Sequence, residues 1–314
     1  MKFVKGMDLS TLLELERCGA KYYDNGEERD LLAIMKSYDV DTIRIRLWND
    51  PWSETGESYG AGENDLKTSL EIAKRVTAAG FGVLLNFHYS DFWADPGKQI
   101  KPKAWADYGV KELEQAVYDY TLESMQTFLD AGVNITMVQV GNELSNGLLW
   151  PEGKVPNYDN IATFVNAGIR AVRKADATIP VMIHLDNGGN NALYREWFDN
   201  FTKRGEDFEI IGLSYYPFWH GTLSNLQSVL GSIAKNYGKK VMVAETSYAY
   251  TFEDGDGHEN NVRADKASSL DLNYNISVQG QADSVSSVME TISNTTNGIG
   301  MFYWEPAWIP VQTY

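Results

Sequence analysis

Two glutamates each close a short, strongly apolar segment, and their chemistry could be catalytic. Glu143 ends the segment VQVGNE directly after Asn142, and Glu245 ends the segment VMVAE. A glycosidase needs two carboxyl groups, one that protonates the leaving oxygen and one that attacks the anomeric carbon or activates water. A single glutamate in such a place would more often form an ion pair or cap a helix. Two of them, at the ends of two buried apolar segments, indicate catalysis.

Tryptophans gather around the same places in the sequence. Of the nine tryptophans, only Trp197 falls in a predicted helix. A tryptophan ring offers a flat apolar face with a polar edge, which suits the C–H face of a sugar ring. Packing explains a single tryptophan well, but the placement of the group favours sugar binding. The eight that lie at strand ends or in the following loops are Trp48, Trp52, Trp93, Trp105, Trp150, Trp219, Trp304 and Trp308.

The segments that carry these residues alternate with amphipathic stretches along the whole chain. Most of the segments are apolar on both faces, which is typical of buried parallel strands. Apolar residues at helical spacing between them predict helices over 66–76, 113–128 and 161–172. The predicted strands are Phe3–Ser10, Thr42–Trp48, Gly82–Tyr89, Met137–Glu143, Val181–Asp186, Ile210–Pro217, Lys240–Thr246 and Gly298–Glu305.

Eight strands with intervening helices predict one α/β domain over residues 1–314, a single (β/α)8 TIM barrel. The alternative is a doubly wound open sheet. That fold typically has a glycine-rich first turn, which is absent here, because Gly6 is the single glycine among residues 5–10. Only residues 306–314 follow the last predicted strand. A closing helix needs about ten residues or more, so we expect the last helix to be missing or truncated.

In such a barrel, catalytic groups lie at the carboxyl ends of the strands. Polar and aromatic residues therefore become candidates wherever a predicted strand ends. These residues are Asp8, Arg46, Trp48, His88, Tyr89, Asp91, Asn142, Glu143, His184, Asp186, Asn187, Tyr215, Tyr216, Trp219, His220, Glu245, Trp304 and Glu305.

Composition excludes several classes of function. The chain carries 27 lysines and arginines against 43 aspartates and glutamates, a net charge of −16 that would repel nucleic acid. The single cysteine, Cys18, excludes a disulfide scaffold and a cysteine zinc cluster. No apolar run reaches the length of a membrane-spanning helix, and the N-terminus has no signal-peptide core. The four histidines form no His-x-His pair, which disfavours a metal-dependent hydrolase.

Motifs from Phe3 to Pro310 resemble glycoside hydrolase family 53, the endo-β-1,4-galactanases, within clan A of retaining barrel glycosidases. The resemblance implies internal hydrolysis of β-1,4-galactan, the type I arabinogalactan side chains of pectin, to galacto-oligosaccharides. It also implies a monomer with a polysaccharide as its partner, secreted or at the cell surface, with the cytoplasm as the alternative. The matching motifs are FVKGMDLS, IRIRLWNDP, NFHYSDFWADPGKQ, QVGNELSNGLLWPEG, HLDNG, GLSYYPFWHG, VAETSYAYT and FYWEPAWIP.

The same resemblance implies a role for each site residue. Glu143 would be the acid/base, Glu245 the nucleophile, and Asn142 a partner of the sugar 2-hydroxyl. Arg46 and Tyr215 would hold Glu245 ionised and oriented. The remaining residues of the expected substrate-binding set are His88, His184, Asn187 and Trp304 around the reactive sugar, Trp93, Trp150, Trp219 and His220 along the cleft, and Asp8 and Asp91.

A second motif follows Glu245. The segment EDGDGHEN, residues 253–260, places Asp254, Asp256, His258 and Asn260 at alternate positions. Alternating oxygen ligands separated by glycine are typical of a calcium loop, although the EF-hand glutamate is absent. The resemblance implies a structural Ca²⁺ here, and the alternative is a solvated acidic loop.

Two other functions stay open. The chain could be another clan A endo-glycanase that cuts β-mannan or β-glucan, which a substrate panel would separate from a galactanase. It could instead be a non-catalytic glycan-binding barrel, which would bind galactan without releasing reducing ends.

Overall fold

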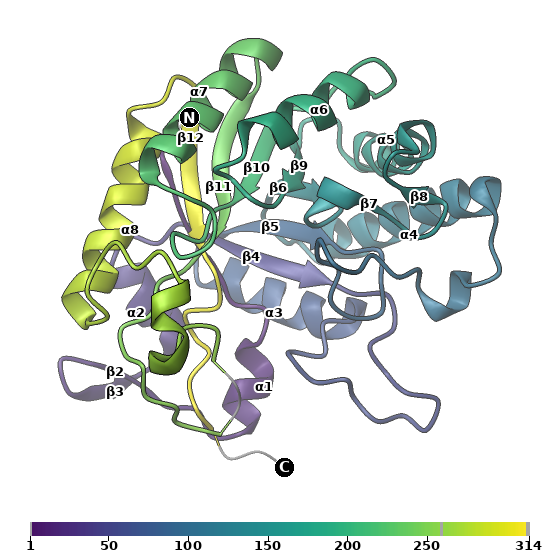
Figure 1. Ribbon diagram of the computed structural model, residues 1–314. Helices are drawn as coiled ribbons and strands as arrows, with labels where there is room; N and C mark the ends of the chain where they lie inside the picture. Colours follow the sequence, from purple (N-terminus) through teal and green to yellow (C-terminus); the bar gives the residue numbers. More distant parts are fainter. Residues whose placement is uncertain (1, 258–259, 312–314) are drawn as a thin grey trace.

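The computed structural model describes residues 2–257 and 260–311, and its centre is a closed parallel barrel (Figure 1). The strand order around the barrel is β1-β4-β5-β6-β9-β10-β11-β12, back to β1. This confirms the predicted (β/α)8 fold. The strands are β1 (Val4–Asp8), β4 (Thr42–Leu47), β5 (Gly82–Phe87), β6 (Ile135–Val140), β9 (Val181–Leu185), β10 (Ile210–Ser214), β11 (Lys240–Thr246) and β12 (Gly298–Tyr303).

Helices connect successive strands and surround the barrel in Figure 1. Their buried residues recur at helical spacing, so each helix covers the outer face of the strands with one apolar stripe. The helices are α1 (Leu12–Arg17), α2 (Leu31–Ser37), α3 (Leu66–Ala78), α4 (Val110–Asp130), α5 (Tyr158–Ala175), α6 (Asn191–Phe201), α7 (Leu223–Tyr237) and α8 (Val278–Ser293), with short 3₁₀ turns at Lys103–Trp105, Leu144–Asn146 and Ala264–Ser269.

Side-chain caps fix where several helices begin. Asp65 accepts a hydrogen bond from the backbone of Thr68 at the start of α3, and Thr222 and Asn225 form a reciprocal capping box at the start of α7. Two small hairpins interrupt the regular alternation of strand and helix. They are β2 (Tyr22–Asp24) with β3 (Glu27–Arg29), and β7 (Gly147–Leu148) with β8 (Gly153–Lys154).

Within the described residues no helix follows β12, and the barrel closes by direct pairing of its last and first strands. β12 pairs directly with β1 in parallel, from Val4 opposite Gly300 to Met7 opposite Tyr303. Residues 304–311 then form turns and extended chain, as the sequence predicted. The Tyr22 hydroxyl donates to the carbonyl of Ala307, which ties this segment to the first hairpin.

Inside the barrel, an apolar layer lies beneath a polar one. The lower layer contains Val4, Leu84, Met137, Met182, Ile210, Met242, Ala244, Ile299 and Phe302. Gly6 makes room for it, since a Cβ there would lie 2.2 Å from the Phe302 ring. Side chains alternate along a strand, so the next inward residue lies two positions further on. That step leads from Leu84 to Asn86, from Met137 to Gln139 and from Met182 to His184.

The described helices were also searched for a membrane span. None of those within residues 2–257 and 260–311 combines the length and the apolar character that crossing a bilayer requires.

Candidate active site

Glu245 lies near the end of β11, and its carboxylate is held by an arginine and a tyrosine. Arg44 Nη2 lies 2.8 Å from Glu245 Oε1, and the Tyr216 hydroxyl donates to Glu245 Oε2 over 3.1 Å. Arg44 Nη1 also pairs with Asp8 over 2.9 Å, and both members of that pair are buried. A buried cation and a donor hydroxyl stabilise the ionised form of a carboxyl group. These two contacts hold the Glu245 carboxylate in one orientation.

Glu143 follows β6, the fourth strand of the barrel, in a left-handed backbone conformation with φ of 50°. Ser214, at the end of β10, donates to Glu143 Oε1 over 2.5 Å. Burial, and then the charge of Glu245, raise the pKa of Glu143 well above its ordinary value of 4.5. A carboxyl group with a raised pKa keeps its proton to higher pH than an ordinary glutamate and can serve as a general acid. The two glutamates therefore lie in different environments, since Glu245 contacts a buried cation and Glu143 a neutral hydroxyl.

A network of amides supports both glutamates from below. Arg44 donates to Gln139 Oε1 and, over 2.9 Å, to Asn142 Oδ1. The other side of the Asn142 amide donates to the carbonyl of Ala94. These bonds fix the orientation of the Asn142 side chain directly before Glu143. An amide held in this way is preorganised to meet a sugar hydroxyl without loss of rotamer entropy.

Arg46 does not contact Glu245, which corrects the expectation from the sequence. Its Nη1 pairs with Glu305 Oε1 over 2.6 Å, its Nη2 donates to the carbonyl of Ala61, and its guanidinium lies 4.2 Å from the ring centre of Trp93. Arg44 and Arg46 both point into the barrel because they are two residues apart on one strand. Arg44 lies deeper in the barrel and reaches Glu245, whereas Arg46 lies two residues nearer the carboxyl end of the strand.

Tyr215 also differs from its expected role. Its side chain is buried on the outer side of the strand, and its hydroxyl donates to the carbonyl of Gly221. The next residue, Tyr216, points inward and contacts Glu245. The β10–β11 register shifts between Leu213 and Ser214, so that Ser214 lies opposite Glu245. Successive side chains alternate between faces, and only one of the two adjacent tyrosines can reach the site.

Four more residues of the expected substrate-binding set lie outside the cavity around the glutamates. His184 is fully buried behind Ser214, with its Nε2 2.9 Å from that hydroxyl. Asp91 accepts the backbone N–H groups of Asp50 and Lys103 and so joins two loops. Asn187 ends its strand in a left-handed turn, and the Trp150 ring packs under the ammonium of Lys154. These side chains shape the site without lining it.

Most of the other expected residues do line the cavity, among them Asp8, His88, Asn142, Trp93, Trp219, His220 and Trp304. His88 has its Nδ1 within hydrogen-bond distance of the Trp48 indole and the backbone of Ala94. The site also contains residues that the candidate set omitted. Arg44 lies in the middle of a predicted strand, so its position did not make it a candidate. Asp186, Tyr216 and Glu305 were candidates because they lie at strand ends, but they were assigned no role from the sequence.

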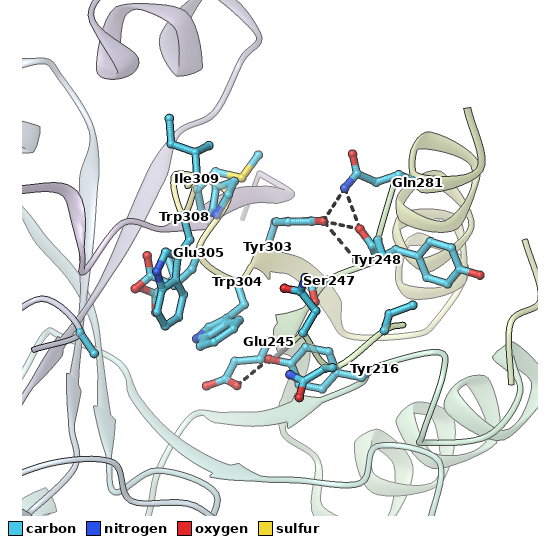
Figure 2. Close-up of a pocket in the computed structure, with 18 of the residues that line it drawn as sticks. Tyr216, Glu245, Ser247, Tyr248, Gln281, Tyr303, Trp304, Glu305, Trp308 and Ile309 are labelled. Carbon is cyan, nitrogen blue, oxygen red and sulfur yellow. Dashed lines mark hydrogen bonds between the residues drawn. The ribbon is translucent and has the colours of Figure 1, made fainter. Parts of the chain in front are cut away.

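Aromatic rings form one wall of the cavity (Figure 2). Trp304 lies between Trp93 and Trp308, with ring centres 6.1 and 5.5 Å away. Trp308 is 47% exposed, and Trp219, on the loop after β10, is 48% exposed. Partly exposed indoles beside a buried pair of carboxyl groups suit a chain of sugar rings.

The residues expected to bind calcium are only partly described. His258 lies outside the described residues. Asp254 accepts the backbone N–H groups of Asp256 and Gly257, which closes a tight turn. Within residues 2–257 and 260–311, no three acidic, histidine or cysteine side chains gather as metal ligands would. The described part of the loop therefore supplies no complete cation site of its own.

The raised pKa of Glu143 predicts a pH-dependent cost to stability. The folded protein binds this proton more tightly than the unfolded chain, so the free energy of unfolding falls as pH rises from 4.5 through the folded pKa. Glu143→Gln cannot ionise, and we expect it to raise the melting temperature by on the order of 2–4 °C at neutral pH, with little effect below pH 4.5. Differential scanning calorimetry from pH 4 to 9 measures this. Exposed Glu123→Gln is the control, and a Glu143→Gln gain that does not vary with pH would contradict the prediction.

Comparison with known proteins places this geometry in a family. A family model described as glycosyl hydrolase family 53 matches residues 4–314. An endo-β-1,4-galactanase of Bacillus subtilis (strain 168) is 47% identical over 311 residues, which cover 98% of this chain and 71% of the relative. An arabinogalactan endo-β-1,4-galactanase of Humicola insolens is 36% identical, over 97% of this chain and 90% of the relative.

Solved structures agree with the sequence comparison. The family 53 catalytic domain of Ignisphaera aggregans superposes with a TM-score of 0.94 at 40% identity, over 98% of this chain and 86% of that one.

Proposed function

The chain belongs to glycosyl hydrolase family 53, and we propose that Glu143 is its general acid/base and Glu245 its nucleophile. It is a glycoside hydrolase, an endo-β-1,4-galactanase like its named relatives. One observation carries the assignment of roles: Glu245 is paired with a buried arginine, whereas the pKa of Glu143 is raised by burial and by the charge of Glu245.

In the first step, Glu245 attacks C1 of the galactose whose bond is cut. A C1–O bond forms to the carboxylate as the C1–O4 bond of the linkage breaks. Glu143 gives its proton to the departing O4, so the leaving sugar departs as a neutral alcohol. Arg44 and Tyr216 hold the Glu245 carboxylate in place for attack.

In the second step, Glu143 is ionised and acts as a base. It takes a proton from water, whose oxygen attacks C1 and displaces Glu245 as a free carboxylate. Two inversions leave the product with the original β configuration. The Ser214 hydrogen bond and the more distant Arg44 stabilise the charge on Glu143 in this half of the cycle.

The aromatic wall supports a polymeric substrate. Exposed rings at Trp219 and Trp308 extend the cavity beyond the space needed for one reactive sugar. We propose that they bind further galactose units of a β-1,4-galactan chain, such as the side chains of pectin, and that the enzyme acts as a secreted or cell-surface monomer. Calcium binding by Asp254, Asp256, His258 and Asn260 remains a prediction.

A substrate panel tests the proposed substrate. We expect kcat/KM on linear β-1,4-galactan to exceed that on β-1,4-mannan and mixed-linkage β-glucan by about 10³-fold or more, because a site that pairs its buried polar groups with one set of hydroxyls leaves them unpaired with another. Reducing-end release and product sizing by chromatography measure this. Equal turnover of mannan would identify a different clan A glycanase, and galactan binding without release would identify a binding protein.

A further inference from the structure

We propose that Ser214 is a positioning residue that confines the acidic proton of Glu143 to Oε2. This inference rests on the proposed function, since it assumes that Glu143 is the general acid. Ser214 would act together with His184, the histidine that lies directly behind it.

Ser214 lies next to both glutamates of the site. It is the last residue of β10 and fully buried. The register shift at Leu213 places it opposite Glu245, and its side chain extends to Glu143. Its Oγ lies 2.5 Å from Glu143 Oε1 and 2.9 Å from His184 Nε2. A hydroxyl between these two atoms has one proton to donate and lone pairs with which to accept.

The surroundings of His184 determine whether Ser214 donates its proton to Glu143 or to His184. The backbone N–H of Glu143 donates to His184 Nδ1 over 3.4 Å, and the Gln139 Nε2 amide lies 3.1 Å from the same nitrogen. Arg44 fixes the Gln139 amide, because a guanidinium can donate only to its oxygen. Two donors therefore face Nδ1. Asn142 Oδ1 also lies 3.1 Å from Nδ1, but both lone pairs of that oxygen already accept, from Arg44 and from Asn86 Nδ2.

A neutral imidazole with an accepting Nδ1 carries its proton on Nε2. Burial, then Arg44 and His88, lower the pKa of His184 well below 6.5, so the ring is neutral at working pH. Nε2–H then donates to Ser214, and the Ser214 proton must go to Glu143 Oε1. Glu143 Oε1 therefore accepts the Ser214 hydrogen bond in both steps of the reaction. The proton that Glu143 donates in the first step and takes up again in the second must then lie on Oε2.

The same bond adjusts the acidity of Glu143. Burial and nearby negative charges raise the pKa of Glu143, while the Ser214 hydrogen bond opposes them. Without that bond, the acid would hold its proton more tightly and would be a poorer donor to the leaving oxygen. The titratable or charged groups that face Glu143 are Glu245 from β11, Asp186 and His184 from β9 and its end, Arg44 from β4, Tyr216 after β10 and Tyr194 from α6.

The test is Ser214→Ala, which removes one buried atom and the bond. We expect kcat/KM on galactan to fall about tenfold and the alkaline limb of its pH profile to move up by about one pH unit, the size expected for a hydrogen bond to a charged group. Ser214→Thr keeps the hydroxyl, so the alkaline limb of its pH profile should lie at the wild-type pH. Ser124→Ala, a buried serine of α4, is the matched control for the loss of a buried hydroxyl.

A second substrate separates proton donation from simple structural damage. A 2,4-dinitrophenyl β-galactobioside has a leaving group that needs no proton, so kcat/KM of Ser214→Ala on it should stay within about twofold of wild type. An unmoved alkaline limb, or an equal loss on both substrates, would overturn the role of Ser214. Wild-type activity in Glu143→Ala would instead overturn the proposed function, so the two failures are distinguishable.

Discussion

Replacing Glu245 by Gln is expected to lower kcat on galactan by about 10⁴-fold or more, because the amide cannot form the covalent intermediate. The amide keeps the shape of the side chain and can still accept from Arg44 or Tyr216, so the fold should survive. Reducing-end release with a thermal melt of each variant measures both effects. Exposed Glu123→Gln on α4 is the matched control.

The smaller variant Glu245→Ala allows a direct test of the role. Removing the carboxylate opens space beside Arg44, where azide can bind and attack C1 once from the opposite face. With an activated aryl β-galactobioside, we expect an α-galactosyl azide product by NMR. A β product, or hydrolysis at the wild-type rate, would show that Glu245 is not the nucleophile.

Glu143→Ala is expected to give the second large effect, a loss of about 10²–10⁴-fold in kcat/KM on galactan, the range that general acid catalysis supplies. Galactan has a poor leaving group, so the loss of the proton donor slows the first step. The activated aryl substrate needs no donor, and its first step should remain close to wild type. The alkaline limb of the pH profile should disappear, because the group whose ionisation produces it is gone.

Azide also separates this variant from Glu245→Ala. In Glu143→Ala, azide takes the place of water in the second step and needs no general base. We expect faster turnover of the activated substrate and a β-galactosyl azide, because two inversions have occurred. No acceleration by azide, together with an unchanged pH profile, would remove Glu143 from the mechanism.

Most of the fold could be predicted from the sequence for a simple physical reason. A strand in a parallel barrel is covered on both faces, so segments such as VLLNF and IIGLS are apolar on both faces, with Asn86 and Ser214 as their polar members. The segments between them carry one apolar face at helical spacing. Each pattern can be recognised within one segment. The number of strand segments, eight with helices between them, predicts the (β/α)8 barrel.

The contacts between side chains inside the site could not be predicted from the sequence in the same way. The motif IRIRL contains two arginines with the same inward direction, and the sequence does not show which one lies level with Glu245. The structure places Arg44 there and gives Arg46 to Glu305. The adjacent tyrosines of SYYPF present the same ambiguity. In the structure Ser214 points inward to Glu143, so Tyr216, two residues further on, also faces the site.

The sequence by itself therefore determined the barrel, the strand ends where chemistry could occur and the two glutamates, because strand periodicity and residue type are properties of single segments. Only the tertiary structure decided which side chains meet. Strand stagger sets the height of each inward residue, and a one-residue shift in register turns a side chain to the other face. For that reason Arg44, Tyr216 and Ser214 contact the two glutamates in the structure, while Arg46 pairs with Glu305 and Tyr215 donates to the carbonyl of Gly221.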